Sequence, residues 1–255
     1  MKLTRKVLNS KFVQRFKRNL ALGSGIYCKI KVLAPTVSEE MRTAKLLNHF
    51  GVTKVLDVGA NTGQFAESLI DFGYKGEIIS YEPVSSAFNE LQKRSKKYKQ
   101  WRSEHCAVGN TNGEIAINVS DDTQFSSIKK IKEEFTNKQN AARIVKSEMV
   151  PIRSLDALIG QHFNENEVLF LKIDTQGYEK EVIEGAAKLI TMVKGMKMEI
   201  PLVNELEIYE DVSWDLNFYI KFFDERGFKC MSLESIGADR QTGIVNEVDG
   251  VFFKI

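Results

Sequence analysis

Short apolar runs alternate with helical patterns along most of the chain. Runs typical of strands cover 54–58, 77–81, 103–108, 114–119, 149–153, 168–173, 194–199, 228–233 and 250–255. Patterns typical of helices cover 39–50, 63–72, 84–97, 154–160, 178–190 and 214–226. This alternation indicates a mostly parallel sheet covered by helices on both faces. The run 168–171 is continuously apolar, as expected of a strand buried on both sides.

The last two strand-like runs differ from the others because no helical pattern separates them. A polar stretch that contains Gly237 and Gly243 joins them instead, which suits an antiparallel pair at the end of the sheet. We therefore predict an α/β fold with a doubly wound, mostly parallel, seven-stranded sheet and a C-terminal antiparallel strand pair.

The N-terminal segment is basic and the remainder of the chain is acidic. Residues 1–38 contain nine Lys and Arg and no acid, which leaves 27 bases and 34 acids, a net charge of −7, in the rest. Apolar residues recur there at roughly helical spacing, at Leu3, Val7, Phe12, Phe16 and Leu20. A basic amphipathic helix can lie on an anionic membrane through residues 1–33. It can also dock on the domain, which we favour, and a mitochondrial transit segment fits as well.

These features divide the chain into a basic extension, 1–38, and one domain, 39–255, whose first helix Ser38 is suited to cap. The acidic body argues against a nucleic-acid partner. The three cysteines form no metal-binding cluster and favour a reduced, cytoplasmic setting. No apolar run is long enough to span a membrane. The oligomeric state is left open.

The densest chemical signal lies at 55–65, where an apolar run leads into Gly59-x-Asn61-x-Gly63 and then a helical pattern. Glycine allows the backbone to approach a ligand closely, and a helix N-terminus offers free N–H groups. Asn61 stands where a dinucleotide fingerprint needs its second glycine, and no Gly-Lys-Ser/Thr phosphate loop follows. The turn resembles the S-adenosylmethionine loop of class I methyltransferases. The alternative is a strand–turn–helix joint that binds nothing.

An acidic residue follows at a suitable distance. The predicted strand 77–81 ends at Glu82-Pro83, about 20 residues after the glycine-rich turn. A carboxylate at this place can accept hydrogen bonds from two ribose hydroxyls, and Pro83 fixes the chain as it leaves the sheet. Taken alone, Glu82 is better explained as an ordinary solvated loop residue, but together with the glycine-rich turn the ribose interpretation is favoured.

A second constellation lies at 171–179, Leu-Lys-Ile-Asp-Thr-Gln-Gly-Tyr-Glu. Asp174 ends a predicted buried strand, where open α/β sheets place their ligands. Lys172 needs a partner if it is buried, and Asp174 or Glu179 could supply it. In the alternative interpretation Lys172 points out of a sheet edge and Asp174 only caps the next helix.

Together these segments resemble FkbM-type S-adenosylmethionine-dependent methyltransferases over about residues 50–200. The resemblance rests on 55–63, Tyr81-Glu82-Pro83, Ala107-Val108-Gly109, Ser126-Ser127, 150–158, 171–179, Gly185-Ala186 and Met198-Glu199-Ile200. Thr175 departs mildly from the usual small apolar residue. The segment 201–255 matches only by its general sheet pattern.

The resemblance implies methyl transfer from S-adenosyl-L-methionine to a hydroxyl of a sugar, a glycan or a secondary metabolite. It assigns the methionine part of the cofactor to the turn, the ribose to Glu82 and the adenine to Ala107 and Val108. The expected cofactor-binding set is Asp57, Gly59, Ala60, Asn61, Gly63, Phe65, Glu82, Pro83, Ala107, Val108, Ser126 and Asp174. No spacing demands a metal, although strand-end acids can bind Mg²⁺.

The catalytic base is the least defined part of the site. A sugar hydroxyl is a poor nucleophile and benefits from a base, for which we nominate Asp174 and Glu199. His105 is a weaker candidate because its strand pattern predicts a packed core histidine. The polar segment 120–147 is either a lid or a mobile surface loop, with a short helix near 129–135. Trp214, Phe218 and Phe222 predict a helix that packs on the sheet rather than a sugar platform.

Two other functions compete with methyl transfer. One is a catalytically silent cofactor-binding domain that acts as a membrane-associated scaffold through its basic N-terminus. The other is an oxidoreductase with a degenerate nucleotide loop, which Asn61 and the terminal antiparallel pair argue against.

Overall fold

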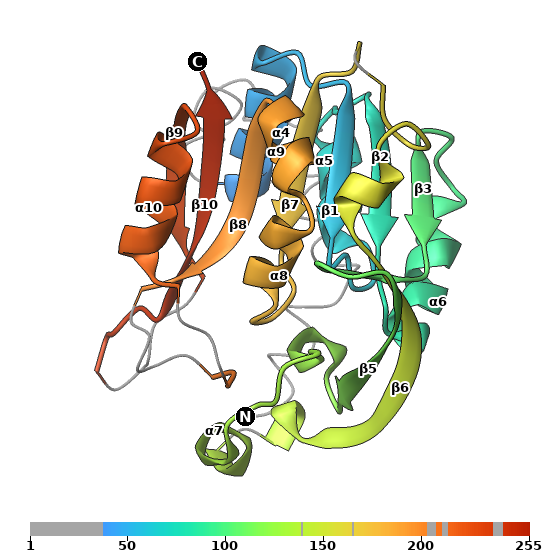
Figure 1. Cartoon of the computed structure of the whole chain (residues 1–255), viewed down its shortest axis with the longest axis vertical. Coiled ribbons are helices and arrows are strands. Elements are labelled where there is room, and N and C mark those ends of the chain that lie inside the picture. The colour runs from blue at the N-terminus through green and yellow to red at the C-terminus, as the bar shows by residue number, and fades with distance from the viewer. Residues whose placement is uncertain (1–37, 139, 165, 203–207, 211–213, 237–241) are drawn as a thin grey trace, which may run out of the picture.

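A seven-stranded sheet forms the centre of the molecule in the computed structural model (Figure 1), with the strand order β3-β2-β1-β7-β8-β10-β9. The structure describes residues 38–138, 140–164, 166–202, 208–210, 214–236 and 242–255. The strands are β1 Lys54–Val58, β2 Glu77–Tyr81, β3 Trp101–Glu104, β7 Leu169–Ile173, β8 Gly195–Pro201, β9 Phe228–Ser235 and β10 Glu247–Lys254. Every residue of β1 and β7 is buried, as the near-continuous apolar runs predict.

The direction of the strands confirms the predicted fold class. The neighbouring strands from β3 through β2, β1 and β7 to β8 pair in parallel. In contrast, β10 runs antiparallel to both β8 and β9. The polar connection after β9 therefore turns the last strand back into the sheet, between β8 and β9.

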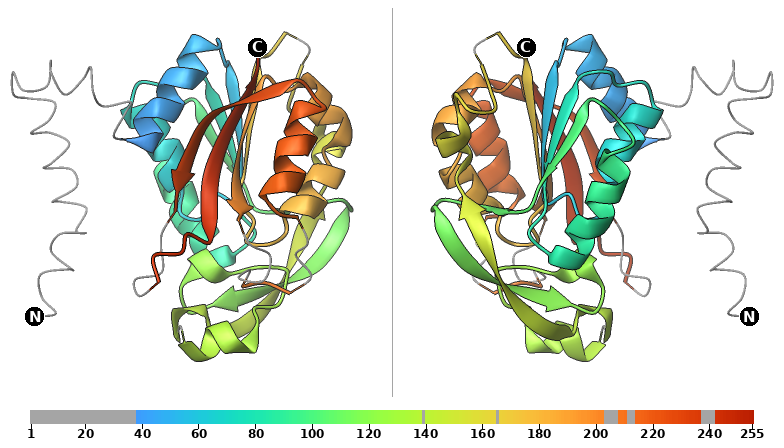
Figure 2. Two further views of the ribbon diagram at one scale, coloured as in Figure 1. Left: turned by 90° about the vertical axis from the view of Figure 1, so that its left-hand side faces the viewer. Right: turned by 90° about the vertical axis from the view of Figure 1, so that its right-hand side faces the viewer.

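Helices cover both faces of the sheet (Figure 2). On one face lie α4 Glu39–His49, α5 Gln64–Asp71 and α6 Ser85–Ser95, and on the other α8 Glu179–Glu184, α9 Ala187–Met192 and α10 Leu216–Asp224. Ser38 caps α4 as predicted, because its Oγ accepts a hydrogen bond from the Met41 N–H at 3.3 Å.

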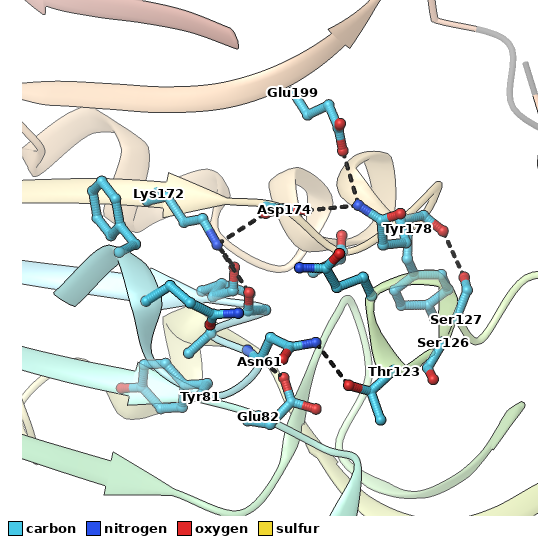
Figure 3. A pocket seen from close by; sticks show the side chains of 18 of the residues that line it. Asn61, Tyr81, Glu82, Thr123, Ser126, Ser127, Lys172, Asp174, Tyr178 and Glu199 are labelled. Carbon is cyan, nitrogen blue, oxygen red and sulfur yellow. Dashed lines mark hydrogen bonds and ion pairs between the residues drawn. The ribbon is translucent and has the colours of Figure 1, made fainter. Parts of the chain in front are cut away.

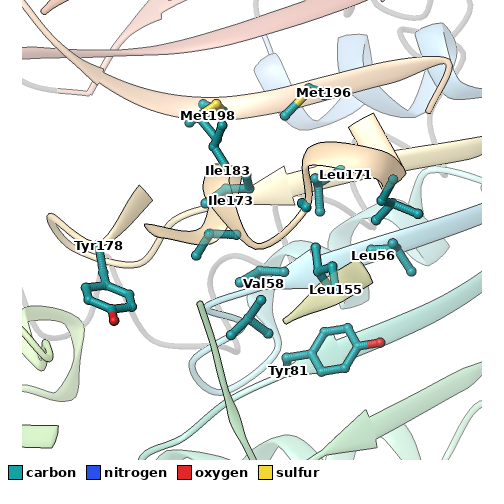
Figure 4. Packing of buried hydrophobic residues seen from close by; sticks show 14 of the residues in the cluster. Leu56, Val58, Tyr81, Leu155, Leu171, Ile173, Tyr178, Ile183, Met196 and Met198 are labelled. Carbon is teal, nitrogen blue, oxygen red and sulfur yellow. The ribbon is translucent and has the colours of Figure 1, made fainter. Parts of the chain in front are cut away.

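Two apolar clusters fill the spaces between the sheet and its helices. In the larger one, side chains from β1, β7 and β8 pack against α8 (Figure 4), with contributions from Leu56, Val58, Leu171, Ile173, Ile183, Met196 and Met198. In the other, Leu47 and Leu69 from the opposite helices pack against Val55 and Phe170. Alternate residues of β1 thus face opposite clusters, as the period of two along a strand requires.

A second sheet lies beyond the C-terminal ends of the central strands (Figure 1). It comprises β4 Ala107–Val108, β6 Ile144–Arg153 and β5 Gly113–Ser120 in that order. The prediction of one strand over 103–108 is therefore wrong. β3 pairs with β2 as far as Glu104, and from Ala107 the chain pairs with β6 in the second sheet. Residues 144–148 also form strand, because they pair with β5, while most of their side chains stay exposed.

The predicted helix at 178–190 is two short helices in the structure. They separate at Gly185, where an added Cβ would lie 1.9 Å from the Gly109 carbonyl oxygen. This close approach to the β4 segment requires glycine and interrupts the helix. The segment predicted as a helix at 154–160 is a 3₁₀ turn, Leu155–Leu158, and the short helix in the polar segment is α7 Glu133–Lys138.

The predictions made for residues 1–37 lie outside the described residues. Among the residues that the structure does describe, no helix is long and apolar enough to cross a membrane.

Candidate active site

A cavity of about 540 Å³ lies at the C-terminal ends of the central parallel strands (Figure 3). Ligands of open α/β sheets bind at this edge, and the volume is typical of small-molecule sites. Ten of the twelve residues predicted to bind cofactor line it: Gly59, Ala60, Asn61, Phe65, Glu82, Pro83, Ala107, Val108, Ser126 and Asp174. The second predicted catalytic residue, Glu199, lines it as well.

The turn after β1 passes very close to the end of β7. Gly59 has a φ of +72°, and a Cβ there would lie 1.7 Å from the Asp174 carbonyl oxygen. Its own carbonyl oxygen accepts a hydrogen bond from Lys172 Nζ at 2.8 Å. Glycine is therefore required for contact between two strand ends, independently of any approach to a ligand.

We expect Gly59→Ala to destabilise the domain by about 2–5 kcal/mol, the sum of a left-handed backbone penalty and an overpacking cost. The matched control is Gly51→Ala, where φ is +65° but nothing lies within 4 Å of the new Cβ. That variant should lose only the backbone part, about 1–2 kcal/mol. Urea unfolding measures both changes, and equal losses in the two variants would contradict the close approach.

Asn61 and Glu82 are held together at the cavity wall. One Glu82 oxygen accepts the Asn61 backbone N–H and the other accepts that of Val84, each at 2.8 Å. Asn61 adopts a φ of +47°, and its side-chain amide donates to Thr123 Oγ1 at 3.2 Å. The turn is thus tied both to the end of β2 and to the segment after β5.

Burial raises the pKa of the Glu82 carboxyl to about 7, against the opposing effect of its backbone hydrogen bonds and Lys172. The side chain is 5% exposed and faces the charges of Lys172 and Asp57. Each of its oxygens retains acceptor capacity beyond the one backbone N–H. When ionised, Glu82 can therefore accept two hydroxyl donors from the cavity.

Two residues of the predicted cofactor-binding set stand outside the cavity lining. Asp57 is fully buried, accepts a hydrogen bond from Ser80 Oγ at 2.8 Å and pairs with Lys172 at 3.3 Å. At Gly63, the residue before α5, a Cβ would meet the Trp101 ring at 2.7 Å. Both residues therefore stabilise the turn on the side away from the cavity. Sequence spacing alone cannot distinguish such supporting positions from positions that line the cavity.

Lys172 connects the ends of β1 and β7. Its ammonium group, on a side chain that is 7% exposed, lies 3.2 Å from Asp174 Oδ2 and 3.3 Å from Asp57 Oδ1. Of the two partners considered for it, Asp174 is confirmed and Glu179 is not. Glu179 is buried and instead accepts the Thr175 N–H at 2.8 Å and the Thr175 hydroxyl at 3.1 Å. That bond also explains the unusual Thr175, whose hydroxyl has a buried acceptor.

The two predicted catalytic carboxyls meet at one side-chain amide. Gln176 Nε2 donates to Asp174 Oδ1 at 2.8 Å and to Glu199 Oε2 at 2.9 Å. Figure 3 shows the Glu199 side chain on β8 pointing toward the amide that also binds Asp174. Sequence reasoning missed Gln176 as a site residue. Its place within 171–179 was the available signal. Its contact with Glu199 could not be read from the sequence, because the two residues are 23 positions apart.

The electrostatic environment shifts the pKa values of these two carboxyls in opposite directions. Partial burial acts to raise the pKa of Asp174, but the Lys172 charge and the hydrogen bonds from Gln176 and Lys172 outweigh it and hold that pKa below its usual value. Burial, followed by the neighbouring Asp174 charge, raises the pKa of Glu199 well above its usual range. Asp174 is therefore the member that ionises more readily, and Glu199 is the member that keeps a proton more readily.

The polar segment after β5 forms one wall of the cavity. Residues 123–128 line it, and Ser127 Oγ donates to the Gln176 carbonyl oxygen at 2.6 Å. Ser126 is buried, and its Oγ accepts the Ser120 N–H. Residues 123–128 therefore lie at the cavity, and the choice between a lid and a mobile surface loop stays a prediction.

Other candidate residues have different surroundings. His105 is exposed, against the prediction of a core histidine: its ring stacks on Phe88 and lies 2.9 Å from the Pro83 carbonyl oxygen, because the chain is leaving the sheet there. Trp214, Phe218 and Phe222 stack on one another at α10 and do not line the cavity. Within the described part of the chain, no group of three or more His, Cys, Asp or Glu side chains is placed to hold a metal ion.

A single antiparallel strand inserted beside the last parallel one distinguishes the class I methyltransferase sheet from dinucleotide-binding folds, and β10 is such a strand. The family model of the methyltransferase FkbM domain matches residues 57–230, and the chain belongs to this family. The chain thus has the family and the fold of a methyltransferase, as the sequence resemblance predicted.

Solved structures with a similar fold include methyltransferase FkbM from Methylobacillus flagellatus KT, at 16% identity and a TM-score of 0.50. The alignment covers 79% of this chain but only 43% of that protein. Magnesium protoporphyrin IX methyltransferase from Synechocystis PCC 6803, solved with bound SAM, aligns over 99% of this chain and 96% of its own, at 10% identity and a TM-score of 0.47. A comparison with curated proteins gives no significant match.

Proposed function

We propose that the chain is an S-adenosylmethionine-dependent O-methyltransferase that acts on a hydroxyl of a neutral glycan or a similar uncharged alcohol. The observation that carries this proposal is an ionised carboxylate, Asp174, in a cavity whose other half has the residues suited to a nucleoside. An alcohol is a poor nucleophile and needs a base that takes its proton. The methyl donor is already activated but supplies no such base.

The residues present fit the cofactor. The buried Glu82 carboxylate can accept the two ribose hydroxyls, and the apolar side chains of Ala107 and Val108 offer a surface for the adenine. The turn at Gly59 and Asn61 lies at the start of α5, where partial positive charge favours the carboxylate of the methionine part. When bound, the cofactor supplies an electrophilic methyl group, and the protein's task is to position the acceptor in line with it.

The charge of the cavity supports an uncharged acceptor. Seven carboxyl side chains line it and only two lysines, namely Glu39, Glu40, Glu82, Asp174, Glu199, Glu247 and Asp249 against Lys172 and Lys197. Each lysine is already held by two carboxylates, Lys197 by Glu39 and Asp249. No arginine lines the cavity within the described residues. A phosphorylated or nucleic-acid acceptor would normally be met by arginine, so this surface disfavours one.

Methyl incorporation tests the proposal directly. The full chain is incubated with labelled S-adenosylmethionine and extracted neutral glycans, phosphorylated glycans or RNA in parallel, and the products are identified by mass spectrometry. We expect methyl ethers on the neutral glycans. Methylation of nitrogen or carbon, or of RNA alone, would contradict the acceptor class but not the family. The silent-scaffold interpretation predicts no transfer to any of these acceptors and gains no support from the comparisons.

The Glu82 pKa near 7 gives a pH prediction for cofactor binding. Only the ionised carboxylate accepts all of its donors, so affinity for the product S-adenosylhomocysteine should fall as the pH falls through 7. The expected loss between pH 8 and pH 6 is about tenfold. Calorimetry measures it, and Glu82→Gln is the control because it cannot titrate while the ligand's own amine still does. An equal pH dependence in the two proteins would contradict this role for Glu82.

A further inference from the structure

We propose that Gln176 is a positioning residue of the methyl-transfer site, whose side-chain amide holds Asp174 and Glu199 together as one proton-handling unit. The inference rests on the proposed function and deepens it. It concerns a residue that sequence reasoning missed and that contacts both catalytic candidates, Asp174 and Glu199.

Both donors and the acceptor of the Gln176 side-chain amide have hydrogen-bond partners. A primary amide has two N–H donors and one carbonyl acceptor. Gln176 gives one N–H to each carboxyl, at 2.8 and 2.9 Å, and its Oε1 accepts the Tyr209 hydroxyl at 2.9 Å. The flipped amide would turn its oxygen toward two carboxyl groups, so these contacts fix its orientation. Tyr209 is itself buried, which keeps water from replacing it.

The backbone around Gln176 is held in an unfavourable conformation. Gln176 has a φ of +56°, which is uncommon and unfavourable for a residue other than glycine. Ser127 Oγ donates to its carbonyl oxygen at 2.6 Å, and a Cβ on the next residue, Gly177, would lie 2.8 Å from the Tyr209 side chain. Strain that is held from several sides is typical of functional turns. Here the strained turn directs the Gln176 side-chain amide toward Asp174 and Glu199.

The arrangement assigns different protonation states to two carboxyls on neighbouring strands. Lys172 pairs with Asp174, whereas no cation lies within ion-pair distance of Glu199 among the described residues. The other charged groups that face the unit are Lys197, Asp57, Glu179, Glu247 and Asp249. Four of these five are acidic, which favours the protonated form of Glu199, whereas the Lys172 ammonium favours the ionised form of Asp174, the base.

The chemical step then balances within the site. The acceptor oxygen forms a bond to the methyl carbon while the bond from that carbon to sulfur breaks. The hydroxyl proton passes to the Asp174 carboxylate, and the products are the methyl ether, the demethylated cofactor and protonated Asp174. Gln176 stabilises the carboxylate form before the step by its N–H bond and touches neither reacting atom.

Carboxyl ¹³C NMR titration of the full chain tests the inference without an acceptor. We expect Gln176→Leu, which keeps approximate size but removes both donors, to raise the Asp174 titration midpoint by about one to two pH units, the loss of one hydrogen bond to a charged group. Tyr209→Phe keeps the ring against Gly177 and should give a smaller shift in the same direction. Gln124→Leu changes another glutamine of the cavity wall and should not move the midpoint.

A second readout separates positioning from simple folding support. In the transfer assay with neutral glycans, the pH of half-maximal rate in Gln176→Leu should rise by the same amount as the Asp174 midpoint. Affinity for S-adenosylhomocysteine should stay at the wild-type value. A merely structural glutamine would lower the amount of folded protein without moving either pH value.

The outcomes distinguish this inference from the proposed function. An unmoved Asp174 midpoint in Gln176→Leu overturns the inference, while wild-type binding and transfer would keep the function. Should Gln176→Leu not fold, an unmoved midpoint in Tyr209→Phe overturns it equally. A wild-type chain that transfers no methyl group refutes the function, whereas a shifted midpoint would still establish Gln176 as the group that holds the two carboxyls.

Discussion

Asp174→Asn should lower methyl transfer by about 10²–10⁴-fold, the usual contribution of a positioned acid or base. The asparagine keeps the shape of the side chain and one oxygen for Gln176 but loses both the charge and the basicity. Affinity for S-adenosylhomocysteine should change far less, because the cavity contacts predicted for the cofactor come mainly from the β1 turn, Glu82 and β4. The labelled-donor assay gives turnover, and calorimetry gives affinity.

Asp249→Asn is the matched control for this change. Asp249 also lines the cavity and also pairs with a buried lysine, Lys197, as Asp174 pairs with Lys172. Both variants lose a carboxylate from a lysine pair, so effects common to the two report on charge balance and folding. Only Asp174→Asn should abolish most of the turnover. Unchanged turnover together with a collapse of cofactor affinity in Asp174→Asn would make Asp174 a cofactor ligand and leave the base elsewhere.

Sequence reasoning located the central sheet well because its strands are buried on both faces. The ranges of β1 and β2 are as predicted, and the antiparallel placement of β10 follows from the missing helix before it. The second sheet was not foreseen as a separate unit. A strand pattern at 103–108 does not reveal that β3 and β4 pair with different partners, and the exposed residues 144–148 lack an apolar face.

The candidate site shows the same division between local and distant information. Motif spacing found the residues around the β1 turn and the end of β2, because each motif is a continuous segment at a strand end. It could not separate the lining Gly59 from the supporting Gly63, since both are glycines in the same turn. It also missed Gln176, whose importance depends on Glu199 and Tyr209 reaching the same amide from distant parts of the chain.

Cofactor recognition is the central claim, and Glu82 is the residue on which it depends most. Replacing Glu82 by alanine removes the acceptor of two ribose hydrogen bonds, each worth about 1.5–3 kcal/mol when the acceptor is charged. The affinity for S-adenosylhomocysteine should therefore fall by at least about 100-fold. Glu104→Ala is the control, because Glu104 ends the neighbouring strand β3 without lining the cavity. Thermal unfolding of each variant shows whether it still folds.

The most direct test is calorimetric titration of the full wild-type chain, Glu82→Ala and Glu104→Ala with S-adenosylhomocysteine and, separately, with NAD. The account predicts that the product binds to the wild type and to Glu104→Ala with similar affinity, binds at least about 100-fold more weakly to a folded Glu82→Ala, and that NAD gives no binding heat. Tight binding of NAD with no response to S-adenosylhomocysteine, or equal affinity of all three proteins for S-adenosylhomocysteine, would contradict it.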